Sequence, residues 1–502
     1  MISTAKLGIS FGKTPLFENV SLKFQAGECY GLIGSNGAGK STFLKILSGE
    51  LESTSGEVII DSAKRISVLR QDHFAFDSYN VLETVLIGDK KLYPIYKKRI
   101  ELYAKTDLTD AEGEEIGLLE ASFGELDGYT AESNASTMLN ELGITNAMQD
   151  KTMNELDAGE KVRVLLAQAL FGNPDVLLLD EPTNQLDYLS VLWLEKFIMS
   201  FKNTVIVVSH DRHFLNKVCT YIADVDFGEI RLYPGNYDFW KSSSELALKQ
   251  QQDQNKKSES KIKELEDFVR RFSANASKSK QATSRKKMIE KLRPEELPIS
   301  RRRSPFIQFK AKRACGTKVL TVDNLSYTIG DEPILTNISF SIEKGDKVAI
   351  IGQNSVSLTA LLDIISGKIS SATGTVEWGE TISNSYFPKD NTDYFSKKLT
   401  LMDWLAQYQE KNDTEILRGF LGRMLFSGDN AKKEVPVLSG GEKARAMFSK
   451  MMLNEGNLLI FDDPTNHLDL ESIQALNNSM KNFKGTILFS SHDHELNETV
   501  AN

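Results

Sequence analysis

The 502-residue sequence contains only three cysteines and no long apolar segment. Cys29, Cys219 and Cys315 are scattered, odd in number and not spaced as metal ligands, so neither a disulfide framework nor a cysteine metal site is expected. No uninterrupted apolar run approaches the roughly 18 residues that cross a bilayer, and the first residues lack the apolar core of a signal peptide. We therefore expect a cytoplasmic globular protein, long enough for two or three domains.

Positive charge is in deficit overall, since the net charge is −9, but it is concentrated in one place. The segment Lys249–Arg313 holds 20 Lys and Arg against 8 Asp and Glu, a net charge of +12 that leaves −21 for the rest. A charged helix pair of this kind can be a solvated coiled coil, but on an acidic protein its charge favours RNA binding. The residues expected to neutralise RNA phosphates are Lys278, Lys280, Arg285, Lys286, Lys287, Arg301, Arg302 and Arg303.

An internal repeat divides the chain. The stretch GECYGLIGSNGAGKSTFLKILSG recurs as GDKVAIIGQNSVSLTALLDIISG, with an offset of 318 residues between Gly34 and Gly352. The offset is only 282 between Asp180 and Asp462, so the first copy carries 36 extra residues. These include KKLYPIYKKRIELYAK, whose periodicity is helical, and we expect a helical arm at about residues 86–129.

Each copy alternates short apolar runs with longer helical patterns, which predicts an α/β fold with a parallel sheet. Between the copies, two polar helical stretches flank SANASKSKQATS, which predicts an α-helical hairpin. The second copy stops ten residues after His492, where the first continues with a pattern of two more strands. The expected domains are 1–241, a basic helical linker at 242–313, and a shorter second copy at 314–502.

A glycine-rich segment, Gly34–Ser41, follows an apolar strand and opens a helix. In that context, backbone N–H groups can wrap a β-phosphate, Lys40 can reach the β and γ oxygens, and Ser41 can ligate Mg²⁺. The segment predicts binding of ATP with Mg²⁺. The nucleotide-binding residues expected here are Gly34, Ser35, Asn36, Gly37, Ala38, Gly39, Lys40, Ser41 and Thr42.

An apolar strand, Val176–Leu179, ends in two carboxylates. Asp180 would bind Mg²⁺ through water, and Glu181 would orient the attacking water. A buried strand with a polar end is the alternative, but an intact phosphate loop earlier in the chain makes the catalytic interpretation stronger.

These motifs, together with the sequence LSGGE at Leu438–Glu442 and with His210 and His492, resemble ABC ATPase cassettes over nearly the whole chain. The resemblance implies that two cassettes pair head to tail within one chain, so that each ATP lies between one phosphate loop and the other cassette's signature. We therefore expect a monomer. The resemblance assigns catalysis to Glu181, His210 and Gln71, metal binding to Ser41, Gln71 and Asp180, and further nucleotide contacts to Phe11, Ser439, Gly440, Gly441 and Glu442.

The sequences EPTNQLD and DPTNHLD, the arm and the basic linker resemble the ABC-F family, and FVRRFSANASKSKQATSRKKMIEKL and LYPGNYDFW resemble its YbiT-like branch. The resemblance implies a soluble translation factor at the ribosomal E site, whose linker reaches toward the P-site tRNA. Two alternatives stay open. The chain could be the ATPase subunit of a transporter with a separate membrane partner, or a non-hydrolysing ATP-dependent scaffold.

The second phosphate loop, Gly352–Thr359, lacks two glycines and has Leu358 in place of the lysine. The signature of the first cassette reads LDAGE and places Asp157 where the γ-phosphate of the second site would lie. Lys389 replaces the expected glutamine and Asp463 the expected glutamate. All these substitutions fall in one composite site, so we expect one active ATP site and one degenerate site. The alternative is that the second half of the chain as a whole is losing its function.

Overall fold

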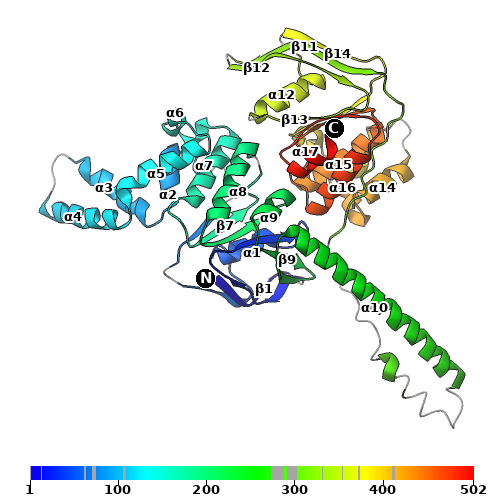
Figure 1. Cartoon of the computed structure of the whole chain (residues 1–502), viewed down its shortest axis with the longest axis horizontal. Coiled ribbons are helices and arrows are strands. Elements are labelled where there is room, and N and C mark those ends of the chain that lie inside the picture. The colour runs from blue at the N-terminus through cyan, green and yellow to red at the C-terminus, as the bar shows by residue number, and fades with distance from the viewer. Residues whose placement is uncertain are drawn as a thin grey trace.

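The computed structural model consists of two α/β cassettes, a helical arm and a long helix that projects from them (Figure 1). The two halves therefore have the tandem α/β organisation that the repeat predicts. The residues that the structure describes are 2–12, 14–61, 64–69, 75–105, 109–184, 186–272, 284, 287–290, 302–330, 332–352, 354–370, 373–409 and 413–502.

The first cassette contains an antiparallel sheet and a mainly parallel one. The antiparallel sheet consists of β1 (Ile2–Phe11), β2 (Thr14–Val20), β3 (Lys23–Phe24) and β5 (Ser55–Ile60). The second sheet has the order β10 (Glu229–Pro234), β9 (Tyr221–Asp226), β4 (Cys29–Gly34), β8 (Thr204–Val208), β7 (Val176–Asp180) and β6 (Ile66–Leu69). Its central strands are continuous apolar runs because both faces are covered. The carboxyl ends of β4, β7 and β8 share one edge, where functional loops of such sheets gather.

Short and long helices surround these sheets. They are α1 (Lys40–Leu47), α2 (Val81–Ile87), α3 (Leu92–Tyr103), α4 (Asp110–Glu125), α5 (Gly128–Glu141), α6 (Asn146–Gln149), η1 (Met153–Glu155), α7 (Ala158–Leu170), α8 (Tyr188–Ser200) and α9 (Arg212–Val218). The expected arm corresponds to α3 and α4, which pack as a hairpin joined by an ion pair between Arg99 and Glu120. Figure 1 shows this hairpin pointing away from the second cassette. The base of the hairpin joins the cassette core through Leu92 and Phe123, to which helix α5 adds Ala131, Ala135 and Leu139.

The second cassette repeats this plan with fewer strands. Its antiparallel sheet consists of β12 (Glu332–Glu343), β11 (Lys318–Ile329) and β14 (Thr373–Trp378). Its parallel sheet has the order β13 (Lys347–Ile350), β17 (Thr486–Ser490), β16 (Leu458–Asp462) and β15 (Asn384–Phe387). Its helices are α12 (Ser355–Ile365), η3 (Thr392–Phe395), α13 (Leu401–Ala406), α14 (Thr414–Arg423), η4 (Gly428–Lys432), η5 (Val435–Val437), α15 (Gly440–Asn454), α16 (Leu470–Asn482) and α17 (His494–Val500). Among the described strands, β13 pairs with β17 only, whereas its counterpart β4 pairs with both β8 and β9.

The linker leaves the first cassette as one straight helix, α10 (Tyr237–Phe272). Residues 284 and 287–290 are also helical, but the rest of the expected hairpin, including Lys278, Lys280, Arg285, Lys286 and Arg301, lies outside the described residues. The returning chain joins the second cassette earlier than the expected boundary at residue 313, because Ile307 and Phe309 are buried in that cassette's core.

The two cassettes also contact each other directly through α9 and α17. Arg212 pairs with Glu495 at 3.2 Å and donates a hydrogen bond to the carbonyl of Leu470 at 3.2 Å. Beside this pair, the rings of His213 and His494 stack with centroids 4.4 Å apart. The cassettes are therefore joined at a point close to the edges where their functional loops gather.

Candidate nucleotide site

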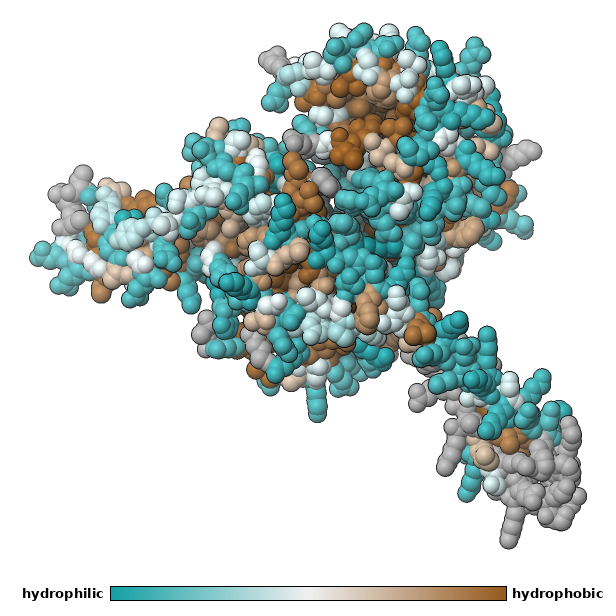
Figure 2. Space-filling model, viewed as in Figure 1, coloured by the Kyte–Doolittle hydropathy of each residue, from teal (hydrophilic) through white to brown (hydrophobic). Residues whose placement is uncertain are grey.

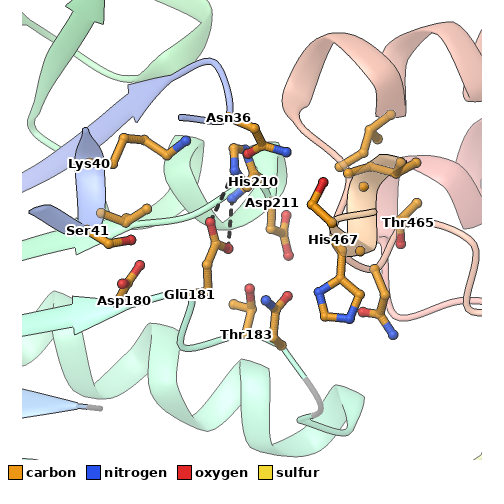
Figure 3. A pocket seen from close by; sticks show the side chains of 18 of the residues that line it. Asn36, Lys40, Ser41, Asp180, Glu181, Thr183, His210, Asp211, Thr465 and His467 are labelled. Carbon is orange, nitrogen blue, oxygen red and sulfur yellow. Dashed lines mark hydrogen bonds and ion pairs between the residues drawn. The ribbon is translucent and has the colours of Figure 1, made fainter. Parts of the chain in front are cut away.

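One cavity of about 710 Å³ is lined by both cassettes. The first cassette contributes the turn from Asn36 to Thr42 and the residues after β7 and β8, and the second contributes Ser439–Glu442. Figure 3 shows Lys40, Glu181 and His210 on one side of this cavity, facing His467 and Thr465 on the other. The structure therefore brings the first phosphate loop and the second signature together, as the head-to-tail pairing predicts.

The phosphate loop is built for close contact with an anion. Gly39 caps the N-terminus of α1 with a φ of 105°, a left-handed conformation that favours glycine. The side chain of Lys40 is almost fully buried, and its Nζ donates hydrogen bonds to the carbonyls of Gly34 at 2.8 Å and Ser35 at 3.3 Å. Burial lowers the pKa of Lys40, and the carboxylates of Glu181 and other neighbours oppose this effect. A bound phosphate would offer this ammonium group the negative charge that burial makes favourable.

The signature lies at the N-terminus of α15, opposite the loop. The hydroxyl of Ser439 caps this helix by accepting a hydrogen bond from the backbone N–H of Glu442. A Cβ at Gly441 would lie 2.8 Å from the carbonyl oxygen of His467 and 3.4 Å from Nδ2 of Asn36, so only glycine fits between the cassettes here. The N-termini of α1 and α15 thus open into one cavity, an arrangement suited to a polyanion.

Asp180 and Ser41 form the candidate Mg²⁺ site. Burial raises the pKa of Asp180, and a hydrogen bond from Ser41 opposes this shift. Within the described residues, Oδ1 of Asp180 is buried without a hydrogen-bond partner. No group of three or more His, Cys, Asp or Glu that could hold a metal occurs there either. One carboxylate and one hydroxyl suit Mg²⁺, which keeps water and phosphate oxygens as its other ligands.

Glu181 is held by His210. Its backbone has a positive φ of 51°, and its carboxylate accepts a hydrogen bond from the backbone N–H of His210 at 3.2 Å. Nε2 of His210 lies 3.3 Å from the other carboxylate oxygen. Burial raises the pKa of Glu181 to about 8, and burial also lowers the pKa of His210 well below its usual value. A neutral imidazole thus orients a carboxyl group that titrates near physiological pH, as a general base requires.

This shift predicts a pH-dependent stability. Because the pKa of Glu181 is raised from 4.5 to about 8 in the folded protein, it contributes stability below the ordinary carboxyl pKa that is lost as pH rises toward 8. Relative to a Glu181→Gln variant, which has no titrating carboxyl, the nucleotide-free wild type should lose on the order of 3 kcal/mol between about pH 5 and pH 8. Urea unfolding of both proteins across this range measures the difference. A difference in unfolding free energy between the two proteins that stays constant with pH would contradict a raised pKa for Glu181.

The second loop does not form a phosphate cradle. Helix α12 begins at Ser355, so the residues aligned with the glycine turn of the first loop form a helical turn instead. The side chain of Asn354 caps this turn by accepting hydrogen bonds from the N–H groups of Val356 and Ser357. Leu358 packs toward Gly352, at which a Cβ would lie 3.2 Å from Cδ2 of the leucine. The amides and space that would hold phosphates are therefore occupied by the protein itself.

The pocket at this second position, of about 350 Å³, is lined by residues of the second cassette only. Ile350, Ile351 and Leu358 are among them, and Figure 2 shows apolar surface over the second cassette in the region of α12 and β13. Asp463 accepts a hydrogen bond from Asn466 and lies 4.0 Å from Nζ of Lys389. Asp157 is not part of this lining; its side chain caps α7 by accepting a hydrogen bond from the N–H of Glu160. Its repulsion of a second γ-phosphate stays a prediction.

Most, but not all, of the expected site residues line the first cavity. Those that do are Asn36, Gly37, Gly39, Lys40, Ser41, Thr42, Asp180, Glu181, His210, Ser439, Gly440, Gly441 and Glu442. Gly34, Ser35 and Ala38 are buried in the loop and do not line the cavity, and Gln71 falls outside the described residues. Phe11 is 61% exposed and is not part of the lining, whereas Leu16 is.

Sequence reasoning missed several lining residues. They are Leu16, Thr183, Asn184, Val191, Val208, Asp211, Arg445, Asp463, Thr465, Asn466, His467, Leu468, Ile473, His492 and Asp493. Part of this set was visible in the repeat, since PTN after the carboxylate strand occurs in both cassettes. Leu16, Val191, Val208 and Asp211 come from the first cassette itself, and the others from the second cassette, where only the relative placement of the two halves reveals them.

Comparisons with known proteins agree with this geometry. A family model described as ABC transporter matches residues 17–184 and 335–466, and a second model with the same description matches residues 223–309. The chain is 54% identical over 504 residues to the ABC transporter ATP-binding protein YkpA of Bacillus subtilis, covering 100% of this chain and 93% of the relative. It is 45% identical over 502 residues to the probable ATP-binding protein YbiT of Escherichia coli O157:H7, covering 100% and 95%.

Solved structures share the two-cassette fold. The archaeal ribosome recycling factor aABCE1, in complex with the ribosomal stalk protein aP1, matches with a TM-score of 0.61 and 19% identity over 99% of this chain and 86% of that chain. RNase-L inhibitor matches with a TM-score of 0.59 and 20% identity, with the same coverage. No described helix is both long and apolar enough to cross a membrane. The matched cassettes and the similarity along the whole chain establish that it belongs to the ABC family of ATP-binding proteins, in the YbiT-like branch of ABC-F.

Proposed function

We propose that this protein is a cytoplasmic, Mg²⁺-dependent ATPase that binds the ribosome near the E site and hydrolyses ATP at one of its two composite sites. The observation that carries the proposal is the asymmetry between the sites. The first joins a complete phosphate loop to a complete signature, whereas the second has a helical turn capped by Asn354 in place of its loop.

Each group at the first site has a defined task in this proposal. Lys40 exchanges its hydrogen bonds to loop carbonyls for phosphate oxygens, and the amides of Gly440 and Gly441 bind the terminal phosphate from the opposite cassette. Glu181, fixed by His210, orients the attacking water. ATP as the substrate would supply the phosphoryl group, and Mg²⁺ held by Ser41 and Asp180 would neutralise the charge of its phosphates. Since loop and signature belong to different cassettes, the bound nucleotide also stabilises the closed pair.

The linker supports the ribosomal part of the proposal. Helix α10 extends beyond both cassettes in Figure 1. Six of its described basic side chains are exposed: Lys249, Lys256, Lys257, Lys261, Lys263 and Arg270. The segment Lys249–Arg313 has a net charge of +12 on a chain that is otherwise at −21, so positive charge is concentrated in the linker. Such a projection fits the phosphate backbone of RNA, whose counterions it would displace.

Ribosome sedimentation tests the proposal. A Glu181→Gln variant retains the phosphate loop but lacks the carboxylate, so it should stay ATP-bound and co-sediment with ribosomes in Mg²⁺-ATP. The same variant in ADP should stay in the supernatant. A double variant, Lys40→Ala with Glu181→Gln, provides the matched control, because it should lose sedimentation in ATP. Equal sedimentation in ATP and ADP would refute an ATP-gated ribosome binder.

The same preparation separates the two alternative functions. A transporter subunit would co-purify with a membrane protein and ignore ribosomes. A non-hydrolysing scaffold would bind ATP without releasing phosphate, which a turnover measurement on the purified wild type detects.

A further inference from the structure

A single arginine connects the linker to both cassettes. Arg302 is the first described residue of the segment that returns from the linker to the second cassette. Its guanidinium pairs with Asp224 of β9 at 2.5 Å. It also lies 3.7 Å from Glu471 at the start of α16 and stacks over the ring of Trp240, with 4.5 Å between Cζ and the ring centroid. Trp240 belongs to the first turns of the outgoing helix α10 and donates a hydrogen bond to Asp224. Outgoing linker, returning linker and both cassettes therefore meet at one side chain.

The chain after Arg302 moves with the second cassette. The N–H of Phe306 donates to the carbonyl of Arg423, the N–H of Phe309 donates to the hydroxyl of Ser479, and Phe309 is buried in the second core. Arg302 itself is tied to Asp224 of the first cassette. Any change in the angle between the cassettes must therefore alter this joint or move the root of the linker.

The joint is also next to the nucleotide site. Glu471 lies two residues after Asp469, and the carboxylates of both residues act electrostatically on Lys40 of the phosphate loop. The charge of Arg302 in turn helps to lower the pKa of His210. The side chain of Arg302 is 15% exposed, so these interactions are only weakly screened by solvent.

We propose that Arg302 is a positioning residue that couples closure of the first nucleotide site to the orientation of the linker. Asp224 and Trp240 hold it to the first cassette and the root of α10, and Glu471 links it to the second cassette beside the site. The inference rests on the proposed use of ATP at the first site, but it does not require ribosome binding.

Distance measurement between two spin labels tests the coupling without ribosomes. One label is placed on α10 by Lys263→Cys and one on α14 by Arg418→Cys, both at exposed positions, while the three native cysteines are buried and resist labelling. In a Glu181→Gln background, Mg²⁺-ATP should shift the distance distribution. Arg302→Ala should abolish the shift and broaden the distribution, and Arg302→Lys, which lacks the planar guanidinium fork, should restore it only in part.

The neighbouring Arg303 is exposed, and Arg303→Ala, with the same loss of charge, should shift as the parent does. Glu471→Gln should reduce the shift while the ion pair between Arg302 and Asp224 stays in place. This variant therefore separates a loss of coupling from a general loss of structure. Equal thermal unfolding midpoints for the Arg302→Ala and Arg303→Ala proteins would exclude misfolding as the cause. An undiminished shift in Arg302→Ala, or no shift in the parent, overturns the inference. Either result leaves ribosome binding to be judged by sedimentation.

Discussion

Replacing Lys40 by Ala or Glu181 by Gln should reduce ATP turnover by about 100-fold or more, whereas Asp463→Asn should leave it almost unchanged. The first site depends on Lys40 for phosphate charge and on Glu181 for the water, and both line the cavity shared by the cassettes. Asp463 occupies the matching position in the second site, also at a positive φ, and borders both cavities, but at its own site Leu358 replaces the lysine and the loop is a helical turn. Phosphate release by the three purified variants and wild type measures the effect.

The equivalence of Glu181 and Asp463 in the backbone makes this a matched comparison. Each donates its N–H to the carbonyl of the adjacent strand at 2.9 Å, Glu181 to Val208 and Asp463 to Ser490. A difference in activity would therefore reflect the surrounding groups and not the local fold. If Asp463→Asn halves the rate, or Glu181→Gln retains half of it, both sites are catalytic and the asymmetric interpretation is wrong.

Reversing five charges of the linker should abolish ribosome association while sparing ATP binding. The substitutions are Lys278→Glu, Lys280→Glu, Arg285→Glu, Lys286→Glu and Lys287→Glu. If each residue neutralises one phosphate, these five contacts account for about 4 of the slope of log affinity against log salt in the unsubstituted linker. Quantitative co-sedimentation of the Glu181→Gln protein at several salt concentrations measures this slope, and the charge-reversed linker in the same background should stay in the supernatant.

A control variant with the same net charge distinguishes loss of direct linker contacts from a general repulsion between the protein and RNA. Lys344, Lys368, Lys397, Lys398 and Lys484 are exposed on the second cassette, and their replacement by Glu changes the net charge equally. This control should co-sediment nearly as well as its parent. Equal loss in both sets would mean that overall repulsion, not the linker, governs association, and unchanged sedimentation of the linker variant would remove the linker as the RNA contact.

Much of the architecture was predictable because the chain is a repeat. The offsets located the arm and paired Asp180 with Asp462, and the glycine turn before Lys40 indicated the phosphate loop without any structure. The helical conformation of the second loop was not predictable from its substitutions alone. Asn354 aligns with Asn36 of the first loop, so the residue itself is common to both loops. In the second loop, where the glycines are absent, Asn354 becomes the N-cap of helix α12.

Contacts between distant segments account for the remaining differences. Phe11 was expected to contact nucleotide; its ring is exposed at the end of its strand and outside the cavity lining, which includes Leu16, so this contact stays a prediction. The joint at Arg302 draws Asp224, Trp240 and Glu471 from three other elements. No local pattern marks residues whose only common property is proximity after folding.

The length of α10 gives small motions at its root a large effect at its far end. Its 36 residues make a helix about 54 Å long. Acting as a rigid lever pivoted near Trp240, it would turn a rotation of about 6° into a sweep of about 5 Å at Phe272. A cassette movement too slight to release the contact between His213 and His494 could thus displace the outer linker by more than the spacing of stacked bases, which is about 3.4 Å.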